Sequence, residues 1–130
     1  MSYSVLICDD EPDVRQAMRR TLRGFELQEA SNPSEALALL KANKFHAIVS
    51  DFSMEAESDG LDLLQHVRIG YPDMVRFLVT ANRDVQIAVR AVNEGAVDRY
   101  FLKPWGDEKL RHALDIVLRS RHAASGSKSE

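Results

Sequence analysis

The feature that most constrains the fold is the alternation of short apolar runs with longer segments of helical period. Five runs, some fully apolar and some alternating, have the length of strands and lie at 5–8, 25–30, 46–51, 75–80 and 98–102. Between and after them, apolar residues recur at intervals of three and four, as Val14, Ala17 and Met18 do after the first run. This alternation predicts an α/β domain in which one parallel sheet is covered by helices on both faces.

Turn and capping residues set the expected limits of the helices. Pro12 suits the first turn of the first helix, and Asn32 before Pro33 suits the start of the second. Helices are also predicted over 61–68 and 84–94, the latter turning Val85, Ala88 and Val92 inward and ending at Gly95. A last helix carries an apolar stripe formed by Leu110, Ala113, Leu114, Val117 and Leu118.

Length and composition narrow the class of protein. The 130 residues suit one domain over 1–121, followed by a flexible tail or linker over 122–130, where the residues are small and polar. Seventeen basic against 20 acidic residues give a net charge of −3, which argues against direct nucleic acid binding by this domain.

Cys8 is the only cysteine, so an internal disulfide is excluded and a reducing compartment is favoured. Without a signal peptide or a membrane-spanning run, a cytoplasmic protein is expected.

Distinctive polar residues stand where the predicted strands end. Asp9 and Asp10 follow the first run, Asp51 ends the third, Thr80 ends the fourth and Lys103 follows the fifth. Ligands of open α/β sheets bind beyond the carboxyl ends of the strands, so these groups are expected in one crevice. Like charges at such short distances would drive at least one carboxylate to take up a proton unless a cation were bound. Oxygen ligands with room for water and phosphate favour Mg²⁺, and the set suits phosphoryl transfer.

Four stretches in this order carry a resemblance to a known family. VLICDDEP, IVSD, VTA and YFLKPW resemble the receiver domain of two-component response regulators, over about residues 4–120. The resemblance implies a flavodoxin-like three-layer sandwich with a five-stranded parallel sheet in the order 2-1-3-4-5 and five helices. It is specific as a combination, although each stretch alone is a weak signal.

The resemblance also assigns roles to individual residues. Asp51 is implied to be the phosphoacceptor, and Lys103 to contact the phosphoryl oxygens. Thr80 and Tyr100 match a coupled switch, in which the aromatic ring turns inward when the hydroxyl moves toward the phosphoryl group. The residues implied to bind Mg²⁺ are Asp10, Asp51 and the backbone carbonyl of Ser53 directly, with Asp9 acting indirectly.

One stretch departs from the family pattern. In DFSMEAESDG, Glu55 stands where the family commonly has proline, and the interval from Asp51 to Gly60 is one residue longer than usual. Asp59 and Gly60 still provide the acid–glycine pair that begins the next helix. The added acids, Glu55 and Glu57, place the carbonyl of Ser53 in doubt as a ligand.

The function implied is a switch controlled by phosphorylation. The phosphodonor would be a phosphohistidine of a sensor histidine kinase or of a histidine phosphotransfer protein. The modified domain would change the face formed by its fourth helix, fifth strand and fifth helix, and so control an effector domain or partner; a homodimer is left open. Such a domain hydrolyses its own aspartyl phosphate slowly but is not an enzyme with an external substrate.

Two other functions fit parts of the pattern. A phosphatase of the haloacid dehalogenase type also uses a nucleophilic aspartate, Mg²⁺ and a lysine, but it expects a second acid where this chain has Ser53. A flavin or nucleotide module on the same fold would need a glycine-rich phosphate loop after the first strand. That position is occupied by CDDEP, whose charge repels phosphate unless a metal intervenes.

Overall fold

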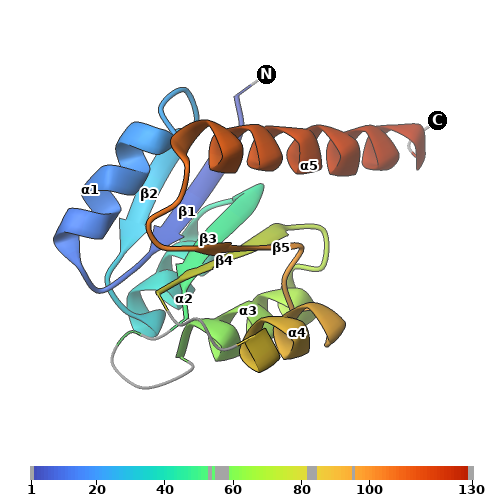
Figure 1. Ribbon diagram of the computed structural model, residues 1–130. Coiled ribbons are helices and arrows are strands. Elements are labelled where there is room, and N and C mark those ends of the chain that lie inside the picture. Colours follow the sequence, from blue (N-terminus) through green and yellow to red (C-terminus); the bar gives the residue numbers. More distant parts are fainter. Residues whose placement is uncertain (1, 53, 55–58, 82–84, 95, 129–130) are drawn as a thin grey trace.

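The computed structural model describes residues 2–52, 54, 59–81, 85–94 and 96–128, and it shows five strands alternating with five helices (Figure 1). The strands are β1 (Ser4–Cys8), β2 (Glu26–Ala30), β3 (Ala47–Asp51), β4 (Val75–Thr80) and β5 (Arg99–Leu102). The helices are α1 (Pro12–Thr21), α2 (Pro33–Ala42), α3 (Asp59–Gly70), α4 (Val85–Asn93) and α5 (Asp107–Lys128). None of these helices is long and apolar enough to cross a membrane.

All strand pairs are parallel, and the sheet has the order β2-β1-β3-β4-β5. Helices α1 and α5 lie on one face of the sheet, and α2, α3 and α4 lie on the other (Figure 1). The predicted three-layer sandwich and the strand order are therefore both confirmed. The chain runs from β1 to the edge at β2 and then returns past β1 to β3, so the strand order reverses between β1 and β3.

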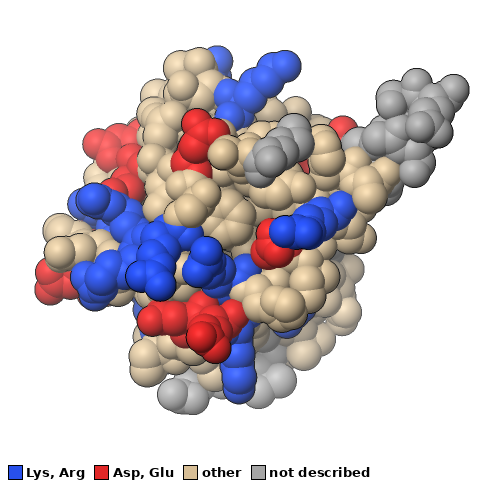
Figure 2. Space-filling view, turned by 90° about the horizontal axis from the view of Figure 1, so that it is seen from above, with Lys and Arg blue, Asp and Glu red and all other residues tan. Residues whose placement is uncertain are grey.

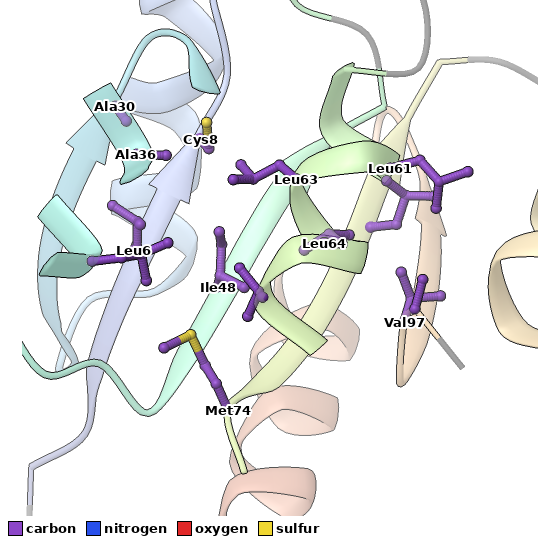
Figure 3. Packing of buried hydrophobic residues seen from close by; sticks show 14 of the residues in the cluster. Leu6, Cys8, Ala30, Ala36, Ile48, Leu61, Leu63, Leu64, Met74 and Val97 are labelled. Atoms are coloured by element: carbon purple, nitrogen blue, oxygen red, sulfur yellow. The ribbon is translucent and has the colours of Figure 1, made fainter. Parts of the chain in front are cut away.

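The sheet separates two apolar clusters. Leu6 and Cys8 point into the cluster under α2, α3 and α4, where Ile48, Leu61 and Leu64 are also buried (Figure 3). The intervening residues of β1 point into the second cluster, under α1 and α5. A strand covered on both faces buries its side chains, which is why the central strands are mostly apolar.

The helix starts follow the capping pattern seen in the sequence. Pro12 occupies the first turn of α1, where a missing backbone N–H costs nothing. Asn32 caps α2, because its side-chain oxygen accepts a hydrogen bond of 2.8 Å from the backbone N–H of Glu35. The Glu35 carboxylate accepts in turn from the backbone N–H of Ser31 at 2.7 Å. Both predicted starts are confirmed.

One helix extends further than expected, and one local prediction is wrong. Helix α5 continues to Lys128, into the segment 122–130 that was expected to be a flexible tail or linker. Ala123 and Ala124 have the highest helix propensity, and a single glycine costs a helix only about 1 kcal/mol, so nothing in 122–128 stops the helix. Val92 is 48% exposed instead of facing inward. The fully buried residue is Ala91, and the next residue turns about 100° away from it on a helix.

Two expectations concern parts that the structure does not describe. Gly95, expected to end the fourth helix, lies outside the described residues, as do the side chains of Val85 and Ala88. The assignment of 122–130 to a linker rather than to the domain stays a prediction.

A buried arginine organises the end of the sheet where β4 begins. The Arg76 side chain is buried within the sheet, and its guanidinium donates hydrogen bonds to the carbonyls of Ala96 at 2.9 Å and Met74 at 3.0 Å. Asp98 accepts from the backbone N–H of Arg76 at 2.8 Å and from the guanidinium of Arg121 at 2.6 Å. Burial lowers the pKa of Arg76. Arg76, Asp98 and Arg121 thus join β4, the segment before β5 and helix α5.

Helix α3 begins in direct contact with the end of β3, and a glycine makes this possible. The Gly60 N–H donates to the Phe52 carbonyl at 2.8 Å. A Cβ atom at Gly60 would lie 1.5 Å from the carbonyl oxygen of Asp51, a backbone atom that cannot rotate away. Only glycine allows α3 to start this close to Asp51.

We predict that Gly60→Ala lowers the free energy of unfolding by at least about 2 kcal/mol, because the helix start must shift. Gly70→Ala is the matched control: it lies in the same helix, and its Cβ would meet nothing within 4 Å. That control should change stability by less than about 1 kcal/mol. Urea denaturation of both variants measures the difference, and equal stabilities would contradict the packing of α3 on Asp51.

Candidate functional site

The fold brings the predicted polar residues to one edge of the sheet. Asp9 directly follows β1, Asp51 ends β3, Thr80 ends β4 and Lys103 directly follows β5. All these strands run parallel, so their carboxyl ends lie at the same edge. Asp9 and Asp51 come from the two strands between which the strand order reverses, where ligands of open α/β sheets bind.

Lys103 lies between two carboxylates at the centre of the site. Its Nζ is 2.8 Å from Asp9 Oδ2 and 3.2 Å from Asp51 Oδ1, and the three side chains are 14%, 5% and 9% exposed. The backbone N–H of Lys103 donates to the Thr80 carbonyl at 2.8 Å, and the peptide bond to Pro104 is cis. Burial alone would lower the pKa of Lys103, but its bond to Asp9 and the charge of Asp51 together raise it. Lys103 is therefore charged in this site.

The surroundings of Asp51 disfavour the ionised form of its carboxyl group. Burial and the nearby charge of Asp9 raise its pKa to about 6, against the opposing effects of Lys103 and of a 2.9 Å hydrogen bond from the Phe52 N–H. Its ionised form is thus less stable here than in water. A further cation at this carboxylate would relieve that cost.

The acidic residues suit a hard divalent cation. Asp9, Asp10 and Asp51 each offer a carboxylate oxygen, and these atoms lie within 4.8 Å of one another. Three carboxylates with one lysine leave an excess of negative charge that burial makes costly. An all-oxygen donor set with an exposed member, Asp10, leaves room for water and fits Mg²⁺. Ser53, the expected third protein ligand, lies outside the described residues.

Asp9 is held more firmly than the sequence indicated. Its Oδ1 accepts a 2.9 Å hydrogen bond from the Glu11 N–H, while Oδ2 is bound by Lys103. The guanidinium of Arg15 donates to the Asp9 backbone carbonyl at 2.7 Å. The direct ion pair between Asp9 and Lys103 was not predicted, because residues 94 positions apart give no local signal of contact.

Thr80 and Tyr100 lie on the same side of the sheet. Tyr100 is aligned with Leu78 in the register of β4 and β5, and both contribute to the cluster under α3 and α4. Thr80 is two residues beyond Leu78 on the same strand, so it shares that face. Thr80 is 3% exposed and Tyr100 is half-buried, an arrangement compatible with the predicted coupling of the two side chains.

Two other side chains have structural roles near the site. The Cys8 thiol lies 3.3 Å from the Met54 sulfur, and burial, followed by the charges of Asp9 and Asp51, raises its pKa to about 12. A thiol with so high a pKa stays protonated and unreactive. Trp105 packs under α1, and its indole N–H donates to the Thr21 hydroxyl at 2.8 Å.

Comparisons with known proteins agree with this geometry. Among solved structures, the chain is similar to the signal receiver domain of an HD domain-containing protein from Pseudomonas fluorescens, with a TM-score of 0.87 and 29% identity. That match covers 95% of this chain and 99% of the other. A CheY-like receiver domain protein from Methanospirillum hungatei shares the fold, with a TM-score of 0.86 and 22% identity over 95% of this chain and 99% of the other.

Curated relatives are longer proteins. The C4-dicarboxylate transport transcriptional regulatory protein DctD of Rhizobium meliloti is 37% identical over 109 residues, which cover 82% of this chain and 23% of DctD. The response regulator protein PilR of Pseudomonas aeruginosa is 33% identical over 119 residues, covering 90% of this chain and 26% of PilR. This chain therefore spans about a quarter of the length of these relatives.

The family is shown by a match along most of the chain. The family model described as the response regulator receiver domain matches residues 5–115, the span that contains every strand but the first residue of β1, and all of the site. With the buried aspartates, the lysine between them and the strand order, the match makes this chain a member of the receiver domain family of two-component response regulators.

Proposed function

We propose that this domain is a phosphorylation switch in which Asp51 accepts a phosphoryl group from a phosphohistidine. The donor is a sensor histidine kinase or a histidine phosphotransfer protein, as is general for the family. The observation that carries the proposal is the placement of Lys103 between Asp9 and Asp51, with Asp10 beside them. A buried lysine beside a carboxylate of raised pKa is suited to bind the anion that phosphoryl transfer brings.

The residues of the site have distinct tasks in this reaction. An Asp51 carboxylate oxygen attacks the phosphorus; the new O–P bond forms as the P–N bond breaks, and the imidazole nitrogen keeps the electron pair. The ammonium of Lys103, already beside Asp51, binds the phosphoryl oxygens. Asp10 and Asp51 would hold Mg²⁺ directly, with Asp9 acting indirectly, and the ion would supply positive charge to the transferring group.

The response to phosphorylation passes through β4 and β5. Thr80 ends the strand next to β3, so its hydroxyl is well placed to bind a phosphoryl oxygen on Asp51. Tyr100 shares its side of the sheet and leads toward the surface formed by α4, β5 and α5. The two helices carry exposed apolar residues, with Val89 at 50% and Val92 at 48% exposure on α4 and Ile116 at 51% on α5. The new charge on Asp51 would favour one of two arrangements of this surface. A partner would sense that change of arrangement, which is the output.

The partners follow from the same proposal. The curated relatives continue well beyond the region that matches this chain, which supports an effector domain or separate partner as the receiver of the signal. A homodimer through the exposed α4 residues is a second form of output. In this role the domain works in the cytoplasm and has no external enzymatic substrate.

Phosphorylation by acetyl phosphate tests the proposal directly. We expect a single phosphoryl adduct in intact-mass spectra that requires Mg²⁺, decays slowly and is abolished by Asp51→Asn. Asp13→Asn is the matched control, because Asp13 is an exposed acid in the first turn of α1 and should leave the adduct intact. An adduct that survives in Asp51→Asn, or turnover of acetyl phosphate without any adduct, would contradict the proposal.

The pKa of Asp51 predicts a pH-dependent stability. Because folding raises this pKa from 3.8 to about 6, the ionised carboxylate destabilises the fold above pH 6, and protonation removes that cost as the pH falls toward 4. In Mg²⁺-free buffer, Asp51→Asn should therefore be more stable than the wild type by about 1–3 kcal/mol at pH 7.5. Urea unfolding should show this difference shrinking toward zero near pH 4. A difference that does not change with pH would contradict the electrostatic cause.

Thr80→Ala separates phosphorylation from its output. The variant keeps Asp51, Asp10 and Lys103, so it should still form the Mg²⁺-dependent adduct. Hydrogen exchange should change on phosphorylation in α4, β5 and the first turns of α5 of the wild type, and this change should be lost in Thr80→Ala. Thr21→Ala is a control at a threonine that contacts Trp105 instead of the site. Identical exchange responses in Thr80→Ala and the wild type would rule out Thr80 as the coupling residue.

A further inference from the structure

A groove lies at the end of the sheet opposite the aspartates. Its walls are the start of the chain, the turn between α1 and β2, and the first half of α5. Its volume is about 710 Å³, and its lining includes the aromatic residues Tyr3 and Phe25 together with basic and acidic side chains from the turn and from α5. Tyr3 and Phe25 precede β1 and β2, whereas Asp9 and Asp51 lie at or just beyond the carboxyl ends of β1 and β3, so the groove and the phosphorylation site lie at opposite ends of the sheet.

The groove is basic although the chain as a whole is acidic. Lys and Arg side chains gather on the face that contains α5 (Figure 2). Four cations line the groove, Arg23, Lys109, Arg111 and Arg119, against two acids, Glu108 and Asp115. Arg119 is paired with Asp115 at 3.1 Å, and among the residues that the structure describes the other three cations form no ion pair. The groove therefore holds positive charge that the described part of the chain does not neutralise.

The groove is built from fixed backbone. The Phe25 N–H donates to the Leu22 carbonyl at 3.2 Å, and the Glu26 N–H donates to the Tyr3 carbonyl at 2.9 Å. Gly24 adopts a φ of +100°, which side-chain-bearing residues rarely accept, and the Arg111 guanidinium lies 3.4 Å from the position that its Cβ would occupy. The Arg111 side chain thus lies beside the turn that contains Gly24. The two backbone bonds fix the backbone at Tyr3 and Phe25, the two aromatic residues that line the groove.

We propose that this groove binds a nucleoside polyphosphate. Guanidinium and ammonium groups without an acidic partner suit phosphate oxygens, which Arg binds with two parallel hydrogen bonds. The half-buried rings of Tyr3 and Phe25 offer planar apolar surface for a base. The carboxylates of Glu108 and Asp115 can accept hydrogen bonds from ribose hydroxyls or a base amino group.

Size and charge favour a small ligand over a polynucleotide. A volume of 710 Å³ falls within the range of about 300–1,000 Å³ that is typical of small-molecule sites. Duplex DNA is bound by neutralising a row of phosphates, which needs more unpaired cations than Arg23, Lys109 and Arg111 supply. The inference does not depend on the proposed phosphorylation, because no residue of the groove belongs to the aspartate site.

Titration calorimetry with ATP in Mg²⁺-free buffer tests the site. We expect saturable binding at one site per chain, weakened at least tenfold by Arg23→Gln combined with Arg111→Gln. Lys109→Gln, at an exposed position of α5, should weaken binding several-fold without affecting folding. Arg68→Gln is the matched control, because Arg68 is an exposed arginine in the last turn of α3, away from the groove, and should leave binding unchanged.

Further probes separate this ligand from other anions. Adenosine and tripolyphosphate should each bind at least threefold more weakly than ATP, and Asp51→Asn should bind ATP as the wild type does. The proposal is overturned by the absence of saturable ATP binding, by binding that the double variant keeps, or by loss of binding in Asp51→Asn. Tripolyphosphate binding as tight as ATP, or a 20-base-pair duplex binding more tightly through the same arginines, would also overturn it.

Discussion

The ion pairs of Lys103 with Asp9 and Asp51 are the interaction on which the rest of the structure depends. Two buried carboxylates from neighbouring strands repel each other, and one ammonium group from the end of β5 holds both at 2.8 and 3.2 Å. Because Lys103 follows β5 and its backbone is bonded to Thr80, the same residue ties three strand ends to a fourth. Burial, followed by the charge of Asp9, raises the pKa of Asp51 to about 6 although Lys103 opposes both effects. The negative charge that remains is what the proposed divalent cation would balance.

The sequence predicted the fold well wherever a local pattern carries the information. Strand and helix positions follow from periodicity and caps. The expectation that the polar residues at the strand ends share one crevice followed from a parallel sheet. The strand order came from the resemblance, because crossover direction and neighbours are not encoded in any short stretch. Long-range contacts were missed for the same reason: neither the Asp9–Lys103 pair nor the buried Arg76 could be derived from spacing. Val92 was misplaced because the apolar pattern of α4 fits two faces of the helix, and only packing shows that Ala91 is buried.

Acidic residues gather at one end of the sheet, and basic residues gather at the other. Asp9, Asp10 and Asp51 gather where the strands end, while Arg23, Lys109 and Arg111 line a groove where they begin. Helix α5 runs from near the end of α1 along the basic side and continues to Lys128 (Figure 1). A partner that approaches the aspartates with its own phosphorylated side chain therefore meets a different surface from any anion that binds beside α5.

The buried Arg76 has a mechanical consequence for strand β4. Its guanidinium is bonded to the carbonyl of Met74, directly before β4, and to that of Ala96, before β5. Its backbone N–H is bonded to Asp98, which Arg121 holds from α5. One end of β4 is therefore clamped, while the other end carries Thr80. Arg76 and Asp98 thus join the start of β4 to the segment before β5 and to α5. In the proposed switch, we expect a shift of Thr80 to leave this end of β4 in place.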